Sequence, residues 1–293
     1  MLVSVAVITY NSSKYIIETL ESVKRQDYDS IQLVISDDCS TDDTVEKCKI
    51  WLENNKSRFV NPVITVNSVN KGVPANINNA IKYCDGIWVK AIAGDDILFD
   101  DCISKNLQFT NDNTDAQVVF SNVRKFKVID RKVVLEKPVI DKELVDFFRK
   151  TVKEKLLVLY EGNILPAASL FIRKDLLQKF PYNERYVLFE DYPMWITLLR
   201  NNIDFHYLDS ETIYYRTNES ISHSDKSFFN EKLDFYNRLY FYDELSSILY
   251  NYYPDIYRRR QIVFFERDIC RFLLKNKYSF LNRILLKIIM ALF

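Results

Sequence analysis

Two pairs of adjacent acidic residues are the part of this sequence best able to do chemistry. Asp95 and Asp96 follow the apolar run WVKAIA, and Glu190 and Asp191 lie in the stretch FEDYPMW. Carboxylates that crowd together repel each other unless a cation or a hydrogen-bond donor meets them. A carboxylate can also take a proton from a hydroxyl group within hydrogen-bond reach. What each pair does therefore depends on the elements that position it.

The alternation of β-rich and helical segments predicts an α/β fold. Nearly continuous apolar runs, typical of strands covered on both faces, lie at residues 2–9, 31–36, 62–67 and 86–93. Helical spacing follows the first three runs, at residues 14–24, from a cap at Ser40 or Thr41 to about residue 54, and at residues 74–83. We therefore expect a doubly wound, mainly parallel sheet flanked by helices. Further on, residues 116–130 indicate two strands and residues 142–159 one helix.

Polar clusters fall at the ends of three of the predicted strands. They are TYNSS after the first strand, SDDCSTDD after the second and AGDD after the fourth. Because ligands of such sheets bind beyond the carboxyl ends of the strands, we expect the clusters to converge on one crevice. Each cluster alone has another explanation, since Asp37 and Asp38 could serve a turn or a helix cap, and Asp95 and Asp96 a turn. Together they favour a shared ligand site.

The chemistry that suits such a crevice is the handling of a diphosphate through a metal ion. Mg²⁺ or Mn²⁺ typically takes one or two protein carboxylates and completes its shell with phosphate oxygens. The metal then stabilises the negative charge that develops on a leaving diphosphate. The sequence has neither GxxxxGK[ST] nor GxGxxG, the glycine-rich loops that cradle phosphates. We therefore predict Mn²⁺ or Mg²⁺ as the cofactor.

Charge and cysteine content exclude several classes of protein. The chain has 40 basic and 40 acidic residues, so no overall field points to nucleic acid. Its five cysteines contain no CxxC pair, which predicts reduced thiols in a cytoplasmic protein rather than a zinc site or a disulfide framework. The N-terminus has no basic region before a short apolar stretch, so we expect a strand there and not a signal peptide.

Five short stretches give the sequence a family resemblance. They are VITYN (residues 7–11), SDDCSTDDT (36–44), NKG (70–72), GDD (94–96) and FEDYPMWITLL (189–199). In this order and spacing they resemble the family 2 glycosyltransferases, inverting enzymes of GT-A fold that move sugars from nucleotide diphosphates. The resemblance covers residues 3–222. It implies a transferase domain over residues 1–222, with a nucleotide-binding part at 1–112 and an acceptor-side part at 113–222, and a helical C-terminal extension over 223–293.

The resemblance also implies which residues meet the donor nucleotide. It assigns nucleotide binding to Thr9, Tyr10, Asn11, Asp38, Asn70, Gly72, Asn78 and Asp95. In similar enzymes the residue at Tyr10 stacks on the base, and the residue at Asp38 accepts a hydrogen bond from it, as suits a uracil-like base. Asp95 would contact the ribose and Asp96 the metal. Ile77 stands where the family has an arginine before the Asn, which removes that donor-phosphate contact.

On the acceptor side, the resemblance makes Asp191 the general base. Glu190 and Trp195 would be acceptor-side neighbours, and the alternative for Asp191 is a favourable charge in a first helical turn. In the stretch IYYRTNESIS, Arg216 and Asn218 are candidates to contact the diphosphate, although Arg216 could equally form a structural ion pair. Asn218 stands where the family has a histidine. His223 is out of register, and His206 alternates like a strand residue.

The C-terminal segment is basic and apolar. Residues 258–293 contain nine basic and two acidic residues, and FLNRILLKIIMALF (280–293) is too short and too interrupted to span a bilayer. Two interpretations compete. The helices could lie on an anionic membrane surface, which suits a polyprenyl-linked acceptor. Alternatively, they could pack on the catalytic domain or on a second subunit, as in a homodimer.

The sequence therefore favours one function over two alternatives. We expect an inverting hexosyl- or N-acetylhexosaminyltransferase that moves a sugar from a UDP-sugar to a saccharide or polyprenyl-linked saccharide, as in capsule or other surface polysaccharide synthesis. A sugar-phosphate nucleotidyltransferase would normally show a glycine-rich phosphate loop near its N-terminus, and VITYNSSKY has no glycine. A noncatalytic nucleotide-binding scaffold would have no need of the carboxylates. The sequence leaves the sugar, the linkage and the oligomeric state open.

Overall fold

The structure is a computed structural model that describes residues 1–130, 132–217 and 227–291. It divides into two compact units. Unit 1 comprises Met1–Leu159 with Ile164–Asn218, and unit 2 comprises Tyr160–Asn163 with Glu219–Phe293. The domain boundary expected between residues 222 and 223 lies outside the described residues, as do Asn218 and His223.

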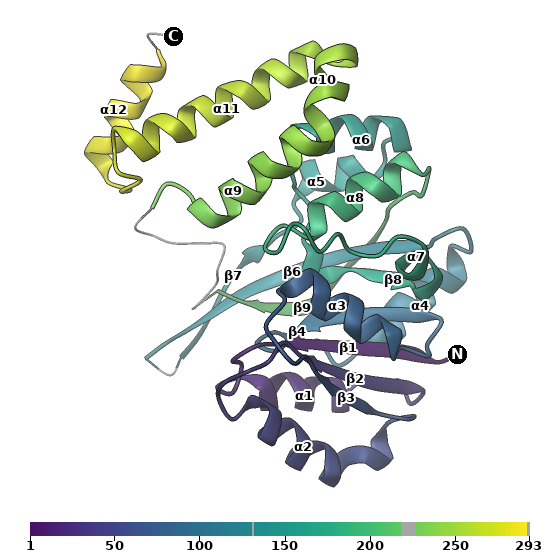
Figure 1. Cartoon of the computed structure of the whole chain (residues 1–293). Coiled ribbons are helices and arrows are strands. Elements are labelled where there is room, and N and C mark those ends of the chain that lie inside the picture. Colours follow the sequence, from purple (N-terminus) through teal and green to yellow (C-terminus); the bar gives the residue numbers. More distant parts are fainter. Residues whose placement is uncertain (131, 218–226, 292–293) are drawn as a thin grey trace. The chain divides into compact units, whose positions relative to one another are not determined.

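Unit 1 begins with alternating strands and helices (Figure 1). Its first half contains β1 (Val3–Thr9), α1 (Ile16–Lys24), β2 (Ile31–Asp37), α2 (Thr44–Asn55), β3 (Val63–Val66), α3 (Val73–Lys82), β4 (Trp88–Ala93), β5 (Ile97–Leu98) and α4 (Cys102–Asp112). Its second half contains β6 (Val118–Ile129), β7 (Lys132–Pro138), α5 (Lys142–Phe148), α6 (Val152–Glu161), β8 (Phe171–Arg173), α7 (Lys174–Lys179), α8 (Asp191–Arg200) and β9 (His206–Arg216). The four strands predicted in the first hundred residues are thus confirmed, and so is the strand at His206.

The strands form one mixed sheet. Its order among the described residues is β3-β2-β1-β4-β8-β6-β9-β5, with β7 paired to β6. The first four strands run parallel, with Val3 opposite both Ile31 and Trp88, so the carboxyl ends of β1, β2 and β4 lie at one edge. Antiparallel pairing enters with β8, β5 and β7. The predicted α/β fold with flanking helices is confirmed, and the parallel part of the sheet positions the first acid pair.

The central strands are mainly apolar because both faces of the sheet are covered. Val3, Val5 and Val7 of β1 belong to one core cluster with Ile16 and Leu20 of α1. The opposite face of β1 and β2 is covered by α3 (Figure 1). All residues from Ile31 to Asp37 are buried, which is typical of a parallel strand between two helical layers.

Three elements differ from their predicted bounds. Residues 118–129 form one continuous strand, and two helices replace the single helix predicted over 142–159. The second helix, α6, begins at a capping box, in which Glu154 donates its N–H to the Thr151 hydroxyl and its carboxylate accepts the Thr151 N–H. Helix α2 begins at Thr44, because the Asp42 carboxylate takes the Thr44 N–H at 3.0 Å and Ser40 and Thr41 bond to other partners.

Unit 2 is helical where it is described. It contains α9 (Glu231–Tyr240), a π-helical turn (Phe241–Leu245), α10 (Ser246–Tyr252), α11 (Pro254–Phe272) and α12 (Phe280–Met290). At its centre the buried carboxylate of Asp234 pairs with Arg238, Arg267 and Arg271 at 2.8, 2.5 and 2.9 Å, and these ion pairs join α9 to α11. A search of the described helices finds none with the length and apolar character needed to cross a bilayer.

Candidate active site

Side chains from the loops after β1 and β2 hold each other in place. Asn11, whose backbone lies in the left-handed region at φ 49°, donates its N–H to the Ser40 hydroxyl at 2.8 Å. The Asn11 side-chain oxygen accepts the Thr41 N–H at 2.8 Å. Ser40 in turn donates its N–H and hydroxyl to the Asp37 carboxylate at 2.7 and 2.5 Å. Asn11 and Asp37 therefore use their polar atoms to fix the backbone at the ends of both strands.

Asp38 organises the loop that leads into α3. Its buried carboxylate accepts the N–H groups of Lys71 and Gly72 at 2.9 and 2.7 Å, and the Asn67 amide at 2.9 Å. The Gly72 N–H also reaches the side-chain oxygen of Asn70 at 3.2 Å. The structure thus brings together three of the residues predicted to bind nucleotide, Asp38, Asn70 and Gly72. The Lys71 N–H also lies 3.2 Å from the second carboxylate oxygen, so all four lone-pair sites of Asp38 have a contact within this loop.

Thr9 and Tyr10, at the end of β1, differ in exposure. The Tyr10 side chain is 47% exposed, so its ring is open to stacking. Thr9 is buried, and its hydroxyl has no hydrogen-bond partner within the part of the chain that the structure describes. An unpartnered buried hydroxyl is rare in folded proteins. Its position at the end of a central strand fits contact with a ligand.

Asn76 is a site residue that sequence reasoning missed. From the first turn of α3, its buried amide donates to the carbonyl groups of Ser36 and Thr9 at 2.9 and 3.3 Å, and its oxygen accepts the Ser36 hydroxyl at 2.6 Å. It therefore ties α3 to the ends of β1 and β2. The available signal was its helical spacing, because Asn76 shares a face with the apolar residues Ile77 and Ala80 and must point toward the sheet.

The turn after β4 closes onto the end of β1. A Cβ atom on Gly94 would lie 2.9 Å from the Thr9 hydroxyl and 3.0 Å from that of Ser12, so only a glycine permits this approach. The Asp38 N–H donates to the Thr9 carbonyl at 2.9 Å. The three polar clusters after β1, β2 and β4 therefore converge, as the strand order predicts.

Asp96 is the more buried member of the first acid pair. It is 2% exposed, and its Oδ1 accepts the Arg216 N–H at 2.9 Å. Burial and the charge of Asp95 raise the pKa of Asp96 well above its usual range, while the Arg216 N–H and the charges of Lys90 and Arg216 act in the opposite direction. The pair thus lies among cations that belong to the protein itself.

Arg216, the last residue of β9, braces the same turn. Its Nε donates to the Asp95 carbonyl at 2.8 Å, and its Nη2 pairs with the Glu18 carboxylate at 2.6 Å. Its guanidinium also lies over the rings of Tyr15 and Phe126, 4.1 and 4.6 Å from their centroids. Of the two roles considered for Arg216, the structural ion pair is therefore present. A contact to diphosphate stays a prediction.

The residues around Asp96 fit a divalent cation. Asp96 offers a hard oxygen ligand whose charged form, opposed by burial and by Asp95, gains from a nearby cation. Among the described residues, no three His, Cys, Asp or Glu side chains gather as a metal site. The remaining ligands would have to be phosphate oxygens of a donor and water, which is how Mg²⁺ commonly binds in sites with one or two carboxylates.

The second acid pair lies where α8 begins. Asp191 is the first residue of α8 and accepts the Tyr192 N–H at 2.7 Å, while Glu190 occupies the N-cap position. Burial and the charge of Asp191 raise the pKa of Glu190 from 4.5 to about 8. At neutral pH the pair therefore carries mainly one negative charge. The first turn of a helix favours that charge, so both roles considered for Asp191 remain compatible with its place.

Trp195, predicted to lie on the acceptor side, is instead fully buried. Its ring packs edge-on against Phe120, with centroids 5.0 Å apart, and near Phe205. One turn beyond Asp191, it supports α8 from within the core. Its side chain does not reach a surface at which an acceptor could bind.

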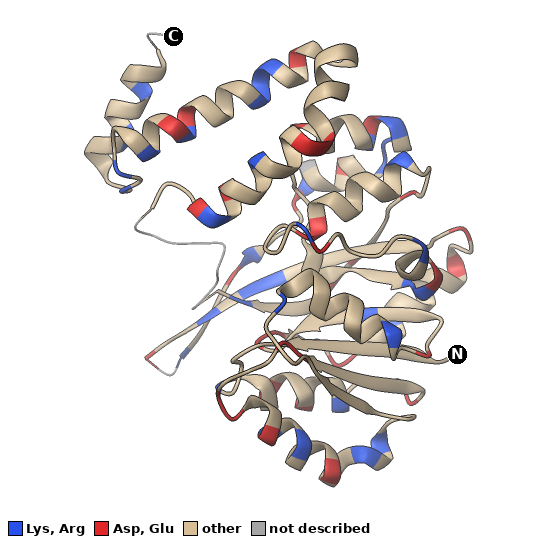
Figure 2. Ribbon diagram, viewed as in Figure 1, with Lys and Arg blue, Asp and Glu red and all other residues tan. Residues whose placement is uncertain are grey.

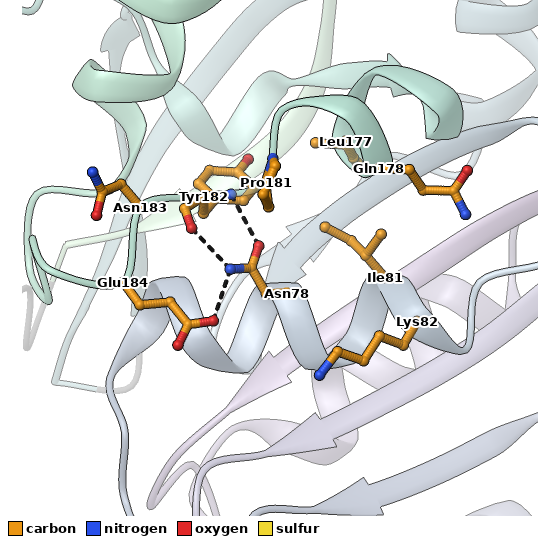
Figure 3. A pocket seen from close by; sticks show the side chains of 9 residues that line it. All are labelled: Asn78, Ile81, Lys82, Leu177, Gln178, Pro181, Tyr182, Asn183 and Glu184. Carbon is orange, nitrogen blue, oxygen red and sulfur yellow. Dashed lines mark hydrogen bonds between the residues drawn. The ribbon is translucent and has the colours of Figure 1, made fainter.

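The amide of Asn78 clamps the loop that leads to the second acid pair (Figure 3). It donates to the Tyr182 carbonyl at 2.8 Å and to the Glu184 carboxylate at 3.0 Å, and its oxygen accepts the Tyr182 N–H at 2.9 Å. Because Asn78 follows Asn76 by two positions, about 200° around the helix, it points away from the strand ends. In this structure its polar atoms serve the loop and not the nucleotide side predicted for them.

The clamped loop approaches both α3 and the second acid pair. Burial and the charges of Glu190 and Asp191 raise the pKa of the Tyr182 hydroxyl, which indicates that its ring lies near both acids. Gly72 has a backbone φ of 87°, and a Cβ atom there would overlap the Val187 side chain. Helix α3 and its N-cap Gly72 therefore contact the loop after β2, through the Gly72 N–H on Asp38, and the loop before α8, through Asn78 and Gly72.

A cavity of about 670 Å³ lies beside this clamp (Figure 3). Its lining residues are Asn78, Ile81, Lys82, Leu177, Gln178, Pro181, Tyr182, Asn183 and Glu184. None of the four carboxylates of the two acid pairs is among them. The cavity is thus separate from the residues expected to do chemistry.

Comparison with known proteins identifies the chain's relatives. Residues 4–180, more than half of the chain, match the family described as "Glycosyl transferase family 2". The Escherichia coli protein named "UDP-Glc:alpha-D-GlcNAc-diphosphoundecaprenol beta-1,3-glucosyltransferase WfaP" is 26% identical over 216 residues, which are 73% of this chain and 77% of that protein.

Solved structures share the fold. Staphylococcus aureus TarS 1–349 in complex with UDP-GlcNAc superimposes with a TM-score of 0.59 at 22% identity, over 82% of this chain and 65% of that chain. The mannosyltransferase PcManGT from Pyrobaculum calidifontis, solved with GDP-Man and Mn²⁺, gives a TM-score of 0.51 at 16% identity, over 73% of this chain and 56% of that one. The chain thus spans less than two thirds of either structure. At these identities the likeness confirms the GT-A fold.

Proposed function

The chain belongs to glycosyltransferase family 2, and from this premise we propose that it is an inverting enzyme that transfers a sugar from a UDP-sugar to a hydroxyl group of a saccharide acceptor. The observation that carries the proposal is the presence of two separate acid pairs in unit 1. One pair lies where the ends of β1, β2 and β4 meet, and the other lies at the start of α8. Family membership sets this function ahead of nucleotidyl transfer and of a noncatalytic scaffold.

The donor nucleotide is assigned to the loops after β1, β2 and β4. Tyr10 stacks on the base, and the Asp38 carboxylate takes the N–H of a uracil ring in place of its 3.2 Å contact with the Lys71 N–H. Thr9 offers a buried hydroxyl that lacks another partner among the described residues. Asp95 contacts the ribose. The names of the relatives support uridine, since WfaP is named for UDP-Glc and TarS was solved with UDP-GlcNAc.

Asp96 would hold the divalent cation, Mn²⁺ or Mg²⁺. When bound there, the cation supplies charge stabilisation for the diphosphate that leaves. Mn²⁺ is supported by the structural neighbour that was solved with it. The protein's own part is to keep Asp96 fixed, through the Arg216 N–H on its Oδ1 and through the Thr19 hydroxyl on its carbonyl at 2.7 Å.

Asp191 acts as the general base. The acceptor hydroxyl donates its proton to the Asp191 carboxylate while its oxygen forms a bond to the anomeric carbon. The bond from that carbon to the diphosphate oxygen breaks in the same step, and the nucleoside diphosphate leaves with the electron pair. Attack from the face opposite the leaving group inverts the anomeric centre. Glu190 stays protonated at neutral pH, which leaves Asp191 as the charged member of the pair.

The names of the relatives support one class of acceptor. WfaP is named for an undecaprenol-linked sugar, and its match covers 73% of this chain, which supports a polyprenyl-linked saccharide in surface polysaccharide synthesis. A lipid-linked acceptor lies at a membrane surface. The proposal therefore implies that the enzyme works in the cytoplasm at the inner face of a membrane, where nucleotide-sugars are available.

Release of UDP tests the donor assignment. The full chain is incubated with Mn²⁺ and a panel of UDP-sugars, and UDP formation and UDP binding are measured on the same samples. We expect slow hydrolysis of one donor by wild type, and its loss in Asp96→Ala together with weaker UDP binding in the presence of Mn²⁺. Asp100→Ala is the matched control, because Asp100 is an exposed acid on the same segment that pairs with Arg25.

Two results would overturn the proposal. If wild type binds neither UDP nor any UDP-sugar with metal present, the uridine assignment of Tyr10 and Asp38 fails. If Asp96→Ala and Asp100→Ala behave alike, the metal does not depend on Asp96. Addition of lipid-linked and free saccharides to the active sample then identifies the acceptor.

A further inference from the structure

Helix α12 has one apolar face that is already used within unit 2. Leu286 is buried, and Ile289 and Met290 pack with it against Ile269 and Leu274 in a small core cluster. These contacts fix how the helix is rotated against α11. The other faces of α12 take no part in this cluster.

A second apolar face of α12 is exposed. Leu281, Ile284, Leu285 and Ile288 are between 41% and 76% exposed, and we call these four residues the α12 stripe. Their spacing of three, four and seven places them along one side of a helix. Phe272 and Leu273, at the end of α11, and Phe280, at the start of α12, are also exposed apolar residues. An exposed apolar stripe of this kind commonly marks a surface that binds a protein or a membrane.

Basic residues border the α12 stripe. Arg283 and Lys287 lie one turn apart on the side of α12 next to Ile284, as the helical spacing of 100° per residue requires. Residues 272–291 contain four basic and no acidic side chains, and Figure 2 shows α12 and the preceding loop with blue and no red. An apolar stripe bordered only by positive charge is typical of helices that lie in the surface of an anionic membrane.

We infer that the α12 stripe docks on an anionic phospholipid surface. Leu281, Ile284, Leu285 and Ile288 enter the region between headgroups and acyl chains, while Arg283 and Lys287 meet lipid phosphates. This inference deepens the proposed function, since a lipid-linked acceptor lies in that same surface. It rests, however, on unit 2 alone and requires no catalytic step.

A second copy of the chain fits the stripe less well. In a two-fold symmetric dimer the same patch of both copies comes together. The α12 stripes would then bring Arg283 and Lys287 of both copies close to one another, and no acidic residue within 272–291 could offset that repulsion. An anionic surface matches the same residues without repulsion.

Vesicle binding of the full chain tests the inference. Wild type is co-sedimented with vesicles of phosphatidylcholine containing about one third phosphatidylglycerol, and with vesicles of phosphatidylcholine alone. We expect binding to the anionic vesicles and at least about tenfold weaker binding to the neutral ones. Leu281→Ser with Ile288→Ser should lower binding to anionic vesicles by about tenfold or more. Arg283→Gln with Lys287→Gln should lower it about fivefold per charge, and only on anionic vesicles.

The matched control removes two exposed apolar residues elsewhere. Val133 and Leu135 of β7 are 64% and 54% exposed, so Val133→Ser with Leu135→Ser should leave binding unchanged. All variants change exposed side chains and should keep the wild-type melting temperature.

The inference is overturned if wild type does not bind anionic vesicles, or if the stripe variant, Leu281→Ser with Ile288→Ser, binds as well as wild type. It is also overturned if the stripe variant instead abolishes a dimer seen by light scattering. UDP release in free solution should be the same in wild type and in the stripe variant, which separates this test from that of the proposed function.

Discussion

The two acid pairs of unit 1 look alike in sequence and differ in their surroundings. Asp95 and Asp96 follow a central strand, where burial and the charge of Asp95 raise the pKa of Asp96 while the nearby charges of Lys90 and Arg216 act in the opposite direction. Glu190 and Asp191 begin a helix, and the main influences on Glu190 are burial and the charge of Asp191, which raise its pKa to about 8. The first pair is therefore the one whose repulsion is partly offset by cations of the protein, and a bound metal ion would offset it further. The second is built to keep one acid protonated beside one that is charged.

This difference suits the two acid pairs to different roles in the proposed reaction. Pairs of titratable groups whose environments push their pKa values apart commonly hold different roles in one site. A cation-supported pair suits a metal and a diphosphate, and a single charged carboxylate suits a proton acceptor. Helix α3 contacts both regions, through Asp38 on one side and through Asn78 on the other. Predictions that affect one pair and spare the other test this division.

The largest effect is expected at Asp191. Asp191→Asn removes the proton acceptor but keeps the size of the side chain, so transfer should slow by about 10² to 10⁴ fold. UDP binding with Mn²⁺ should stay as in wild type, because the donor side is untouched. The measurements are single-turnover transfer and calorimetric UDP binding. Asp175→Asn is the control, since Asp175 is an exposed acid in the first turn of α7. Equal rates for the two variants would end the assignment of Asp191 as base.

A loss of stability is expected when Arg216, which holds the turn of the first acid pair, is replaced. Arg216 is nearly fully buried and bonds to Asp95 and Glu18, so Arg216→Gln should lower the free energy of unfolding by about 1–3 kcal/mol. Arg25→Gln breaks the exposed pair with Asp100 and should cost at most about 1 kcal/mol. Urea denaturation of both variants measures the difference. If Arg216→Gln lowered the free energy of unfolding no more than Arg25→Gln does, Arg216 would not hold the turn of Asp95 and Asp96 in place.

The parallel part of the fold could be predicted from the sequence, because its signals are local. The runs at β1, β2 and β4 are mainly apolar, and each is followed by polar residues. The break between α5 and α6 could also have been found, since Thr151 and Glu154 have the spacing of a capping box. The mixed pairing at β8 could not, because strands of three residues carry little pattern of their own.

The acidic residues of the candidate site could be predicted from the sequence, but the residues that hold them in position could not. Adjacent carboxylates at strand and helix ends are visible in the sequence. The roles of Asn76 and Asn78 depend on which side of α3 faces the sheet, and the two residues point in nearly opposite directions. The burial of Trp195 depends on Phe205, which follows the end of α8, and on Phe120, which is far from it in sequence. Contacts of this kind follow from the tertiary structure alone.

A moderate effect is expected at Asn78, which bonds α3 to the loop before the second acid pair. Asn78→Ala removes three hydrogen bonds to Tyr182 and Glu184, and the loop that leads to Asp191 should lose its fixed position. We expect the rate of transfer to fall about tenfold, with UDP affinity within about twofold of wild type. Lys82→Ala is the control, because Lys82 lines the same cavity (Figure 3). If Asn78→Ala weakened UDP binding and spared the rate, Asn78 would belong to the donor side after all.

A further effect is a change in the pH dependence of stability at Glu190. Its pKa is about 8 in the folded chain and near 4.5 when unfolded, so between these values the folded state holds a proton that the unfolded state lacks. Raising the pH across this window therefore favours unfolding, by at most about 1.4 kcal/mol per pH unit. Glu190→Gln should remove this contribution, and the difference in unfolding free energy between variant and wild type should grow from pH 5 to pH 8. Urea denaturation at several pH values measures it. A difference that stays constant would mean that Glu190 is ionised like Asp191, and the contrast between the two acid pairs would disappear.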